Sequence, residues 1–147
     1  MANLSGLLNE DGRFMQIGTS PSNLTLQIPY PTIGKGIFQT SRMVDAGRNA
    51  SGAVIGQMVG RSIDKQNMGW NVISCEKWWE INQFLEANGL FFYCRYFNHN
   101  LGEWKVRKFY AGDPQVEPRN LDPETQIPRD GVYYNATLNV IDCGEVK

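Results

Sequence analysis

The chain has 147 residues, enough for one ordinary domain but not for two. Its 14 Lys and Arg residues nearly balance 15 Asp and Glu residues, and the net charge of −1 gives no overall attraction for nucleic acid or an anionic membrane. No apolar run approaches the roughly 18 residues of a membrane-spanning helix, and no secretion signal is recognised. We therefore expect a protein made and kept in a cytosol, with no membrane insertion.

The first part of the chain, residues 1–35, is rich in Asn, Ser, Gly and Pro around one alternating stretch at 24–28. It is predicted to be an N-terminal arm with one or two short strands at most. Such an arm cannot bury both faces of a strand by itself, so it either lies along the main domain or reaches a neighbouring copy. We expect that deletion of residues 1–30 leaves a folded chain that assembles less well.

Residues 36–147 are predicted to form a single β-rich domain. A β-prone run at 36–44 leads into 45–52, where small and polar residues indicate a loop. Further strands are expected from Ala53 to about Ile63 and at 70–73.

One helix of about 14 residues is predicted next. Ser74 offers a side-chain oxygen to cap its N-terminus, and Asn88-Gly89 supplies a left-handed stop. Between them, Trp78, Ile81 and Leu85 recur at helical spacing. This aromatic-rich face must lie on a sheet to leave water.

A hairpin is predicted after the helix. The apolar, aromatic run at 90–97 suits a strand covered on both faces, and 103–110 alternates apolar with basic residues after a turn at 98–102. Four basic side chains accompany the aromatic residues and form a candidate basic channel or binding face: Arg95, Lys105, Arg107 and Lys108. They could neutralise single-stranded nucleic acid stacked on the rings, or simply be snorkelling side chains on a sheet surface.

The last part of the chain contains a long loop and a strand. Residues 111–131 hold four prolines among charged residues and are predicted to lack regular structure, while alternation from 134 to 140 predicts a half-buried final strand. The expected fold class is therefore mainly β (α+β), a β-sandwich or barrel with one flanking α-helix.

Residue types that carry catalysis are sparse. The one histidine, His99, lies in a polar turn, and the three cysteines include no CxxC pair. Cys75 lies at the predicted helix N-terminus, where the dipole could activate a thiol, but no basic partner is close in sequence. The acidic residues of 111–131 match no calcium-binding loop. We expect no enzymatic activity and no catalytic, cofactor or metal residues, with a small enzyme of unfamiliar site as a rival hypothesis.

An ordered series of short motifs between about Ser41 and Asp142 resembles a family of small tail proteins of long-tailed phages that infect Gram-positive bacteria. The motifs are Asp45, Arg48-Asn49-Ala50-Ser51-Gly52, the strand ending at Trp70, Ser74 with its helix, the strand from Phe91 to Tyr96, Phe109-Tyr110-Ala111-Gly112-Asp113 and Leu138-Asn139-Val140-Ile141-Asp142. The resemblance implies the sandwich or barrel fold shared by tail-tube, distal-tail and baseplate-hub subunits, which form rings around a channel for DNA. The N-terminal arm and the proline-rich insertion are longer than in that family.

The resemblance thus implies a virion structural protein, made in the bacterial host cytoplasm, whose partners are copies of itself and other tail proteins, with transient passage of DNA. The alternative is a single-stranded nucleic-acid-binding β-barrel. We expect subunit contacts on the two loops and the arm, because long loops need an ordering partner. The predicted interface residues are Asp45, Arg48, Asn49, Pro114, Pro118 and Pro123.

Overall fold

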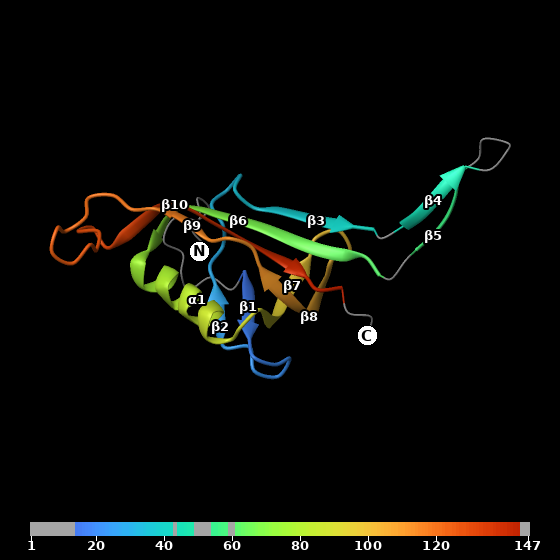
Figure 1. Ribbon diagram of the computed structural model, residues 1–147, viewed down its shortest axis with the longest axis horizontal. Coiled ribbons are helices and arrows are strands. Elements are labelled where there is room, and N and C mark those ends of the chain that lie inside the picture. Colours follow the sequence, from blue (N-terminus) through green and yellow to red (C-terminus); the bar gives the residue numbers. More distant parts are fainter. Residues whose placement is uncertain (1–13, 43, 49–53, 59–60, 145–147) are drawn as a thin grey trace.

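The computed structural model describes residues 14–42, 44–48, 54–58 and 61–144, of which 44–48 and 54–58 are described as backbone. One antiparallel sheet runs in the order β2, β1, β7, β8, β10, β6, β3, and β9 pairs with β10 beside this path. Its strands are β1 (Met15–Gly18), β2 (Leu26–Ile28), β3 (Ile37–Ser41), β6 (Ile63–Ser74), β7 (Phe91–Asn98), β8 (Glu103–Ala111), β9 (Gln115–Glu117) and β10 (Val132–Asp142). The sheet curls into a half-barrel flanked by one helix, α1 (Cys75–Ala87), which confirms the mainly-β α+β prediction (Figure 1).

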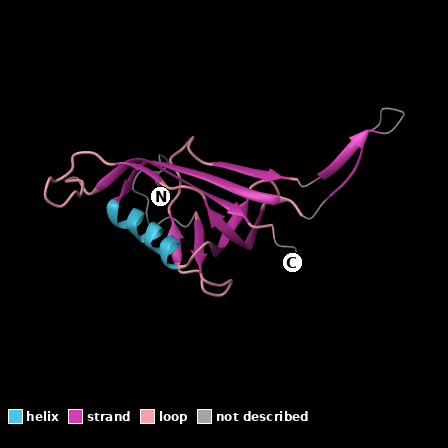
Figure 2. Cartoon of the chain, viewed as in Figure 1, coloured by secondary structure: helices cyan, strands magenta, loops and turns pink. Residues whose placement is uncertain are grey.

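The core fills the inside of this curl. Alternate residues of the strands point inward, as the two-residue period of a strand requires. The buried apolar residues of the strands are Met15, Ile17, Leu26, Ile28, Met68, Trp70, Ile73, Phe92, Cys94, Tyr96, Phe109, Ala136, Leu138 and Val140. Helix α1 covers the open side below the sheet, and Figure 2 shows it as the only helix beside the strands of the described chain.

Helix α1 has the capping predicted from the sequence. The Ser74 hydroxyl accepts a hydrogen bond from the backbone N–H of Lys77 at 3.1 Å, and Gly89 follows the helix in the left-handed region at φ 72°. On the inner face, Ile81 is fully buried and the ring of Trp78 meets that of Trp70 edge to face at 6.1 Å. The aromatic stripe therefore packs on the sheet, as its spacing predicts.

The predicted arm is partly a component of the sheet. Strand β1 lies between β2 and β7, with Ile17 opposite both Leu26 and Cys94. Residues 14–28 therefore complete the core and do not stand apart from the domain. The sequence prediction missed this because the partner strand β7 lies more than 70 residues away in the chain, and periodicity does not identify a strand's partner.

The prediction of a loop at 45–52 is wrong for the first half of that segment. Residues Val44–Arg48 form strand β4, which pairs with β5 (Val54–Met58), and Asp45 lies opposite Gln57. Small residues have weak strand propensity, but hairpin pairing satisfies their backbone groups and overrides it. The strand predicted from Ala53 to Ile63 is accordingly divided between β5 and the start of β6. Asn49, a predicted interface residue, lies outside the described residues.

The proline-rich segment at 111–131 also contains a strand, contrary to the prediction. Pro114 and Pro118 flank β9 and do not interrupt it, so the residues between them can pair with β10. Beyond β9, the Asp122 carboxylate accepts the backbone N–H of Glu124 at 2.8 Å. The segment is thus ordered by its own hydrogen bonds, and Pro114, Pro118 and Pro123 lie exposed on it.

Candidate functional site

The four basic residues predicted to share one face of the hairpin are divided by the pleat of its strands. Lys105 and Arg107 alternate with their neighbours in phase with the buried Phe109, so they point to the inside of the curl. Arg95 and Lys108 point to the outside. The predicted single basic face is therefore two surfaces of different character.

The outer surface is aromatic, and its two basic side chains form cation–π contacts with aromatic rings. The Arg95 guanidinium lies 4.0 Å from the centre of the Trp104 ring, and the Lys108 ammonium lies 4.9 Å from that of Phe91. Trp104 is 47% exposed and Phe91 45%. The prediction that the aromatic strand at 90–97 is covered on both faces is therefore wrong, because Leu90 and Phe91 are 66% and 45% exposed on or beside this face.

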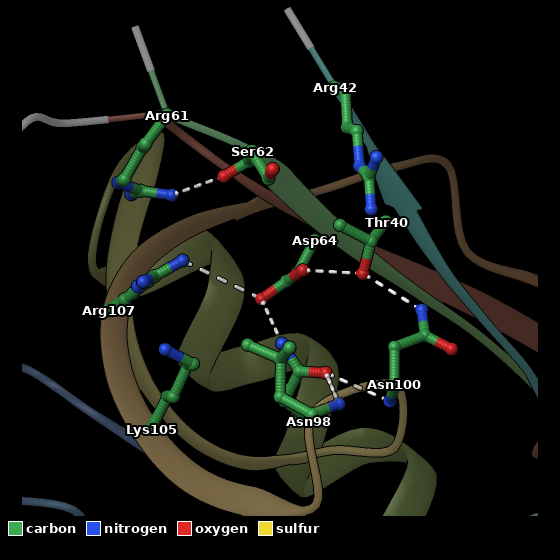
Figure 3. Close-up of a pocket in the computed structure, with 10 residues that line it drawn as sticks. Thr40, Arg42, Arg61, Ser62, Asp64, Asn98, Asn100, Lys105 and Arg107 are labelled. Carbon is green, nitrogen blue, oxygen red and sulfur yellow. Dashed lines mark hydrogen bonds and ion pairs between the residues drawn. The ribbon is translucent and has the colours of Figure 1, made fainter. Parts of the chain in front are cut away.

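The inner surface ends in a polar pocket of about 430 Å³, which we call the root pocket. Arg42 directly follows β3 and Arg61 precedes β6, so the pocket lies where the β4–β5 hairpin leaves the body (Figure 3). Its lining residues are Thr40, Arg42, Arg61, Ser62, Asp64, Asn98, Asn100, Leu101, Lys105 and Arg107.

Asp64 lies at the centre of the root pocket and is 1% exposed. Its carboxylate accepts hydrogen bonds from the hydroxyl of Thr40 at 2.9 Å, the phenol of Tyr96 at 2.5 Å and the amide of Asn98 at 3.1 Å. Burial, and then the bond to Asp64, raise the pKa of Tyr96 far above its ordinary value. The phenol therefore stays protonated and is a permanent donor to the carboxylate.

A second carboxylate, that of Asp142, accepts the backbone N–H of Asp64 at 3.4 Å and is 2% exposed. Arg61 binds it with both terminal nitrogens, Nη2 reaching Oδ1 at 2.7 Å, and the backbone N–H of Gly144 donates to Oδ1 at 2.9 Å. Burial alone would raise the pKa of Asp142, but these hydrogen bonds outweigh it and hold that pKa below its usual value. Asp142 is therefore ionised at neutral pH.

Arg107 links the two carboxylates. Its Nη1 lies 3.6 Å from Oδ2 of Asp64 and 3.5 Å from Oδ2 of Asp142. The result is a network in which two guanidinium groups, from β8 and the start of β6, are oriented by two buried carboxylates. Such a network can hold donors in place for an anion.

Sequence reasoning missed this network, although a signal for it exists. Asp64 lies an even number of residues from the buried Met68 and Trp70, so it points to the same face of its strand. Asp142 is related in the same way to the buried Leu138 and Val140. A charged residue at an inward position of a strand must be paired to be stable. Two such positions, on strands that turn out to be neighbours, indicate a buried polar site.

The cysteines lie apart from the root pocket, two of them buried. Cys75 and Cys94 are 3% and 0% exposed, whereas Cys143 is partly exposed. Burial raises the pKa of both buried thiols, and at Cys75 the charge of Asp130 raises it further. The environment of Cys75 is thus the reverse of an activating one.

We predict that one thiol of the native protein, Cys143, reacts promptly with a disulfide reagent such as DTNB at pH 8, and that all three react in denaturant. Spectrophotometric titration measures this, with a Cys143→Ser variant as the control that should lose the fast phase. If the fast reaction persists in Cys143→Ser but is lost in Cys75→Ser, the hypothesis of an activated thiol at Cys75 is supported instead.

No protein-family model matches this chain, nor does any curated protein or solved structure. Within the described ranges, no His, Cys, Asp and Glu side chains gather in groups of three or more that could hold a metal ion. In the same ranges, no helix is long and apolar enough to cross a bilayer.

Proposed function

We propose that this protein is a structural subunit that assembles with copies of itself into a ring, as part of a phage tail tube or of its distal end or baseplate. The observation that carries the proposal is the β4–β5 hairpin, which extends away from the body as a separate two-stranded sheet (Figure 1). A two-stranded hairpin alone is marginally stable in water. Packing on a second copy would stabilise it.

The body offers a surface for such a hairpin. The half-barrel is open, so β2 and β3 are the edge strands of the main sheet among the described residues. Beside the β3 edge, Ile37 is 62% exposed and Ile33 71%. A hairpin of one copy that meets this edge of the next makes a head-to-tail contact, which closes into a ring when the rotation is suitable.

The place of the ring in a phage tail is proposed from the sequence motifs between Ser41 and Asp142. On this proposal the partners are further copies of the chain and other tail proteins, the location is the virion, and DNA passes through the channel. The β4–β5 hairpin, which carries Asp45 and Arg48, is the main interface. The loop beyond β9, with Pro118 and Pro123, is a second one at the opposite end of the molecule (Figure 1).

We predict that Ala46→Pro abolishes assembly without unfolding the body. Proline removes a backbone N–H from β4, where Ala46 lies opposite Gly56, while the main sheet is unaffected because the hairpin is a separate sheet. Light scattering coupled to size exclusion should show oligomers for the full chain and monomers for the variant, with equal circular dichroism. Negative-stain microscopy of the full chain should show closed rings.

The control is Glu124→Ala, an exposed substitution in the loop beyond β9, which should assemble less well only if that loop is also an interface. The hairpin is excluded as the interface if the full chain and Ala46→Pro have the same mass at every concentration. Monomers for all three chains at high concentration would contradict self-assembly itself.

A further inference from the structure

We infer that the root pocket is a binding site for a phosphate group. The inference concerns the inner end of the half-barrel and does not depend on ring assembly. Its lining combines four cationic side chains, Arg42, Arg61, Lys105 and Arg107, with the neutral donors Ser62 and Asn100.

Among the residues whose side chains the structure describes, the charges of the pocket are not balanced. The four cations face two buried carboxylates, those of Asp64 and Asp142, which leaves a formal excess of two positive charges. Glu103, the partner of Lys105 at 3.1 Å, is largely exposed, with its side chain at 57%, and so screens this excess only weakly. A phosphate group carries about −1.5 to −2 charges at pH 7 and matches the excess. A carboxylate ligand, with one charge, would leave half of it.

The buried carboxylates would not repel such a ligand strongly, because their oxygens already accept hydrogen bonds. Asp142 is bound by Arg61 and the Gly144 N–H, and Asp64 by neutral donors together with Arg107. The two carboxylates hold the guanidinium groups in place and orient them toward the pocket. Arranging donors before the ligand arrives lowers the ordering cost of binding.

Donors remain for the ligand on both sides of the pocket. The described contacts of Arg107 with the two carboxylates use Nη1, and its side chain is 25% exposed, so Nη2 and Nε are left for an oxyanion. Arg42 is exposed and has no partner among the described residues, and it flanks Asp64 on the side opposite Arg107 and Lys105 (Figure 3). Planar guanidinium groups suit the oxygens of phosphate, which they can bind in pairs.

A bound phosphate would therefore join Arg42, at the end of β3, to Lys105 and Arg107 on β8. This would tie the root of the β4–β5 hairpin to the far side of the curl. The chemistry is the same for free phosphate and for the terminal phosphate of a nucleotide strand, and the experiment separates the two sources.

The test is calorimetric titration of the full chain with inorganic phosphate in a low-salt buffer at pH 7.5. The double variant Arg42→Gln/Lys105→Gln removes two rim cations that make no described contact with the buried carboxylates. We expect it to bind phosphate roughly ten- to a hundredfold more weakly, as the loss of charge-assisted hydrogen bonds predicts. The matched control is Arg95→Gln/Lys108→Gln, which removes the same charges from the outer surface and should bind within about twofold of the full chain.

Sulfate, a dianion, should compete with phosphate, and acetate at equal concentration should not. No phosphate binding at about 10 mM, or equal weakening in both double variants, overturns the inference. Thermal melting without phosphate verifies that the variants are folded. If the double variant is unfolded, the single variant Arg42→Gln replaces it, and this one substitution is also expected to weaken phosphate binding. These titrations use the chain in whichever assembly state it adopts, so their failure leaves the ring proposal untouched.

A second titration compares a 5′-phosphorylated dinucleotide with its unphosphorylated form. Preference for the phosphorylated form that is lost in Arg42→Gln/Lys105→Gln supports the site and identifies a strand terminus as its source. If inorganic phosphate binds but neither dinucleotide does, the site is supported and free phosphate is its ligand. Binding of both forms that survives the double variant, without inorganic phosphate binding, would overturn the site.

Discussion

Asp142→Ala is expected to destabilise the protein by about 3 kcal/mol, near the lower end of what removing one partner of a buried ion pair costs. The substitution leaves the Arg61 guanidinium without its carboxylate, and Arg107 with Asp64 alone. The side chains of these arginines are 19% and 25% exposed, so water partly compensates them. Urea denaturation of the full chain and the variant at pH 7 measures the difference in the free energy of unfolding.

The contribution of Asp142 should also depend on pH. Its pKa is lower in the folded protein than in the unfolded chain, so the unfolded chain binds the proton more readily. The stabilisation is therefore complete above the ordinary aspartate pKa of about 3.9 and is lost as the pH falls through the folded-state value. Asp142→Asn should accordingly lose less stability between pH 5 and pH 3 than the full chain does.

Glu117→Ala is the matched control, because Glu117 also pairs with an arginine, Arg119, at 2.5 Å, but at the exposed end of β9. It should leave the urea midpoint unchanged, since water solvates the exposed side chains of Arg119 and Asn135 that Glu117 would otherwise bind. An Asp142→Ala variant as stable as Glu117→Ala would show that the buried network adds no stability and that its carboxylates serve only to place the arginines.

Deletion of residues 1–28 is expected to unfold the protein, contrary to the expectation from sequence for an N-terminal arm. The deletion removes β1 and β2 with four side chains that are 5% exposed or less: Met15, Ile17, Leu26 and Ile28. Burying each contributes about 1.5–3 kcal/mol, so their sum of about 6–12 kcal/mol is as large as the whole stability of a domain, about 5–15 kcal/mol. Circular dichroism and thermal melting of the truncated chain report the loss.

Deletion of residues 1–12 is the corresponding control, because it keeps every described residue of the core. This chain should melt at the temperature of the full one. Any loss of assembly with unchanged melting would then assign a part in the interface to these residues, as the arm hypothesis proposes. A chain lacking residues 1–28 that still melts cooperatively would mean that β7 tolerates an exposed edge and that the core is smaller than its burial indicates.

Several elements could be predicted from sequence because their signals are local. Ser74, the helical spacing of Trp78 and Ile81, and Gly89 together determine α1, and each acts within a few residues of its neighbour. The turn between 98 and 102 and the alternation after it likewise determine the β7–β8 hairpin. The mainly-β fold class follows from these local patterns.

Tertiary structure alone decided the candidate site. The root pocket joins residues from the end of β3, the start of β6 and the β7–β8 hairpin. Its Arg61 is held by Asp142 at the end of β10, 81 residues away in the chain. The composition and spacing of the chain contain the charges, but strand pairing places them, since the order β8, β10, β6, β3 follows from non-local hydrogen bonding. The pleat then decides which basic side chains face the pocket, so that Lys105 and Arg107 line it while Arg95 and Lys108 lie on the opposite surface.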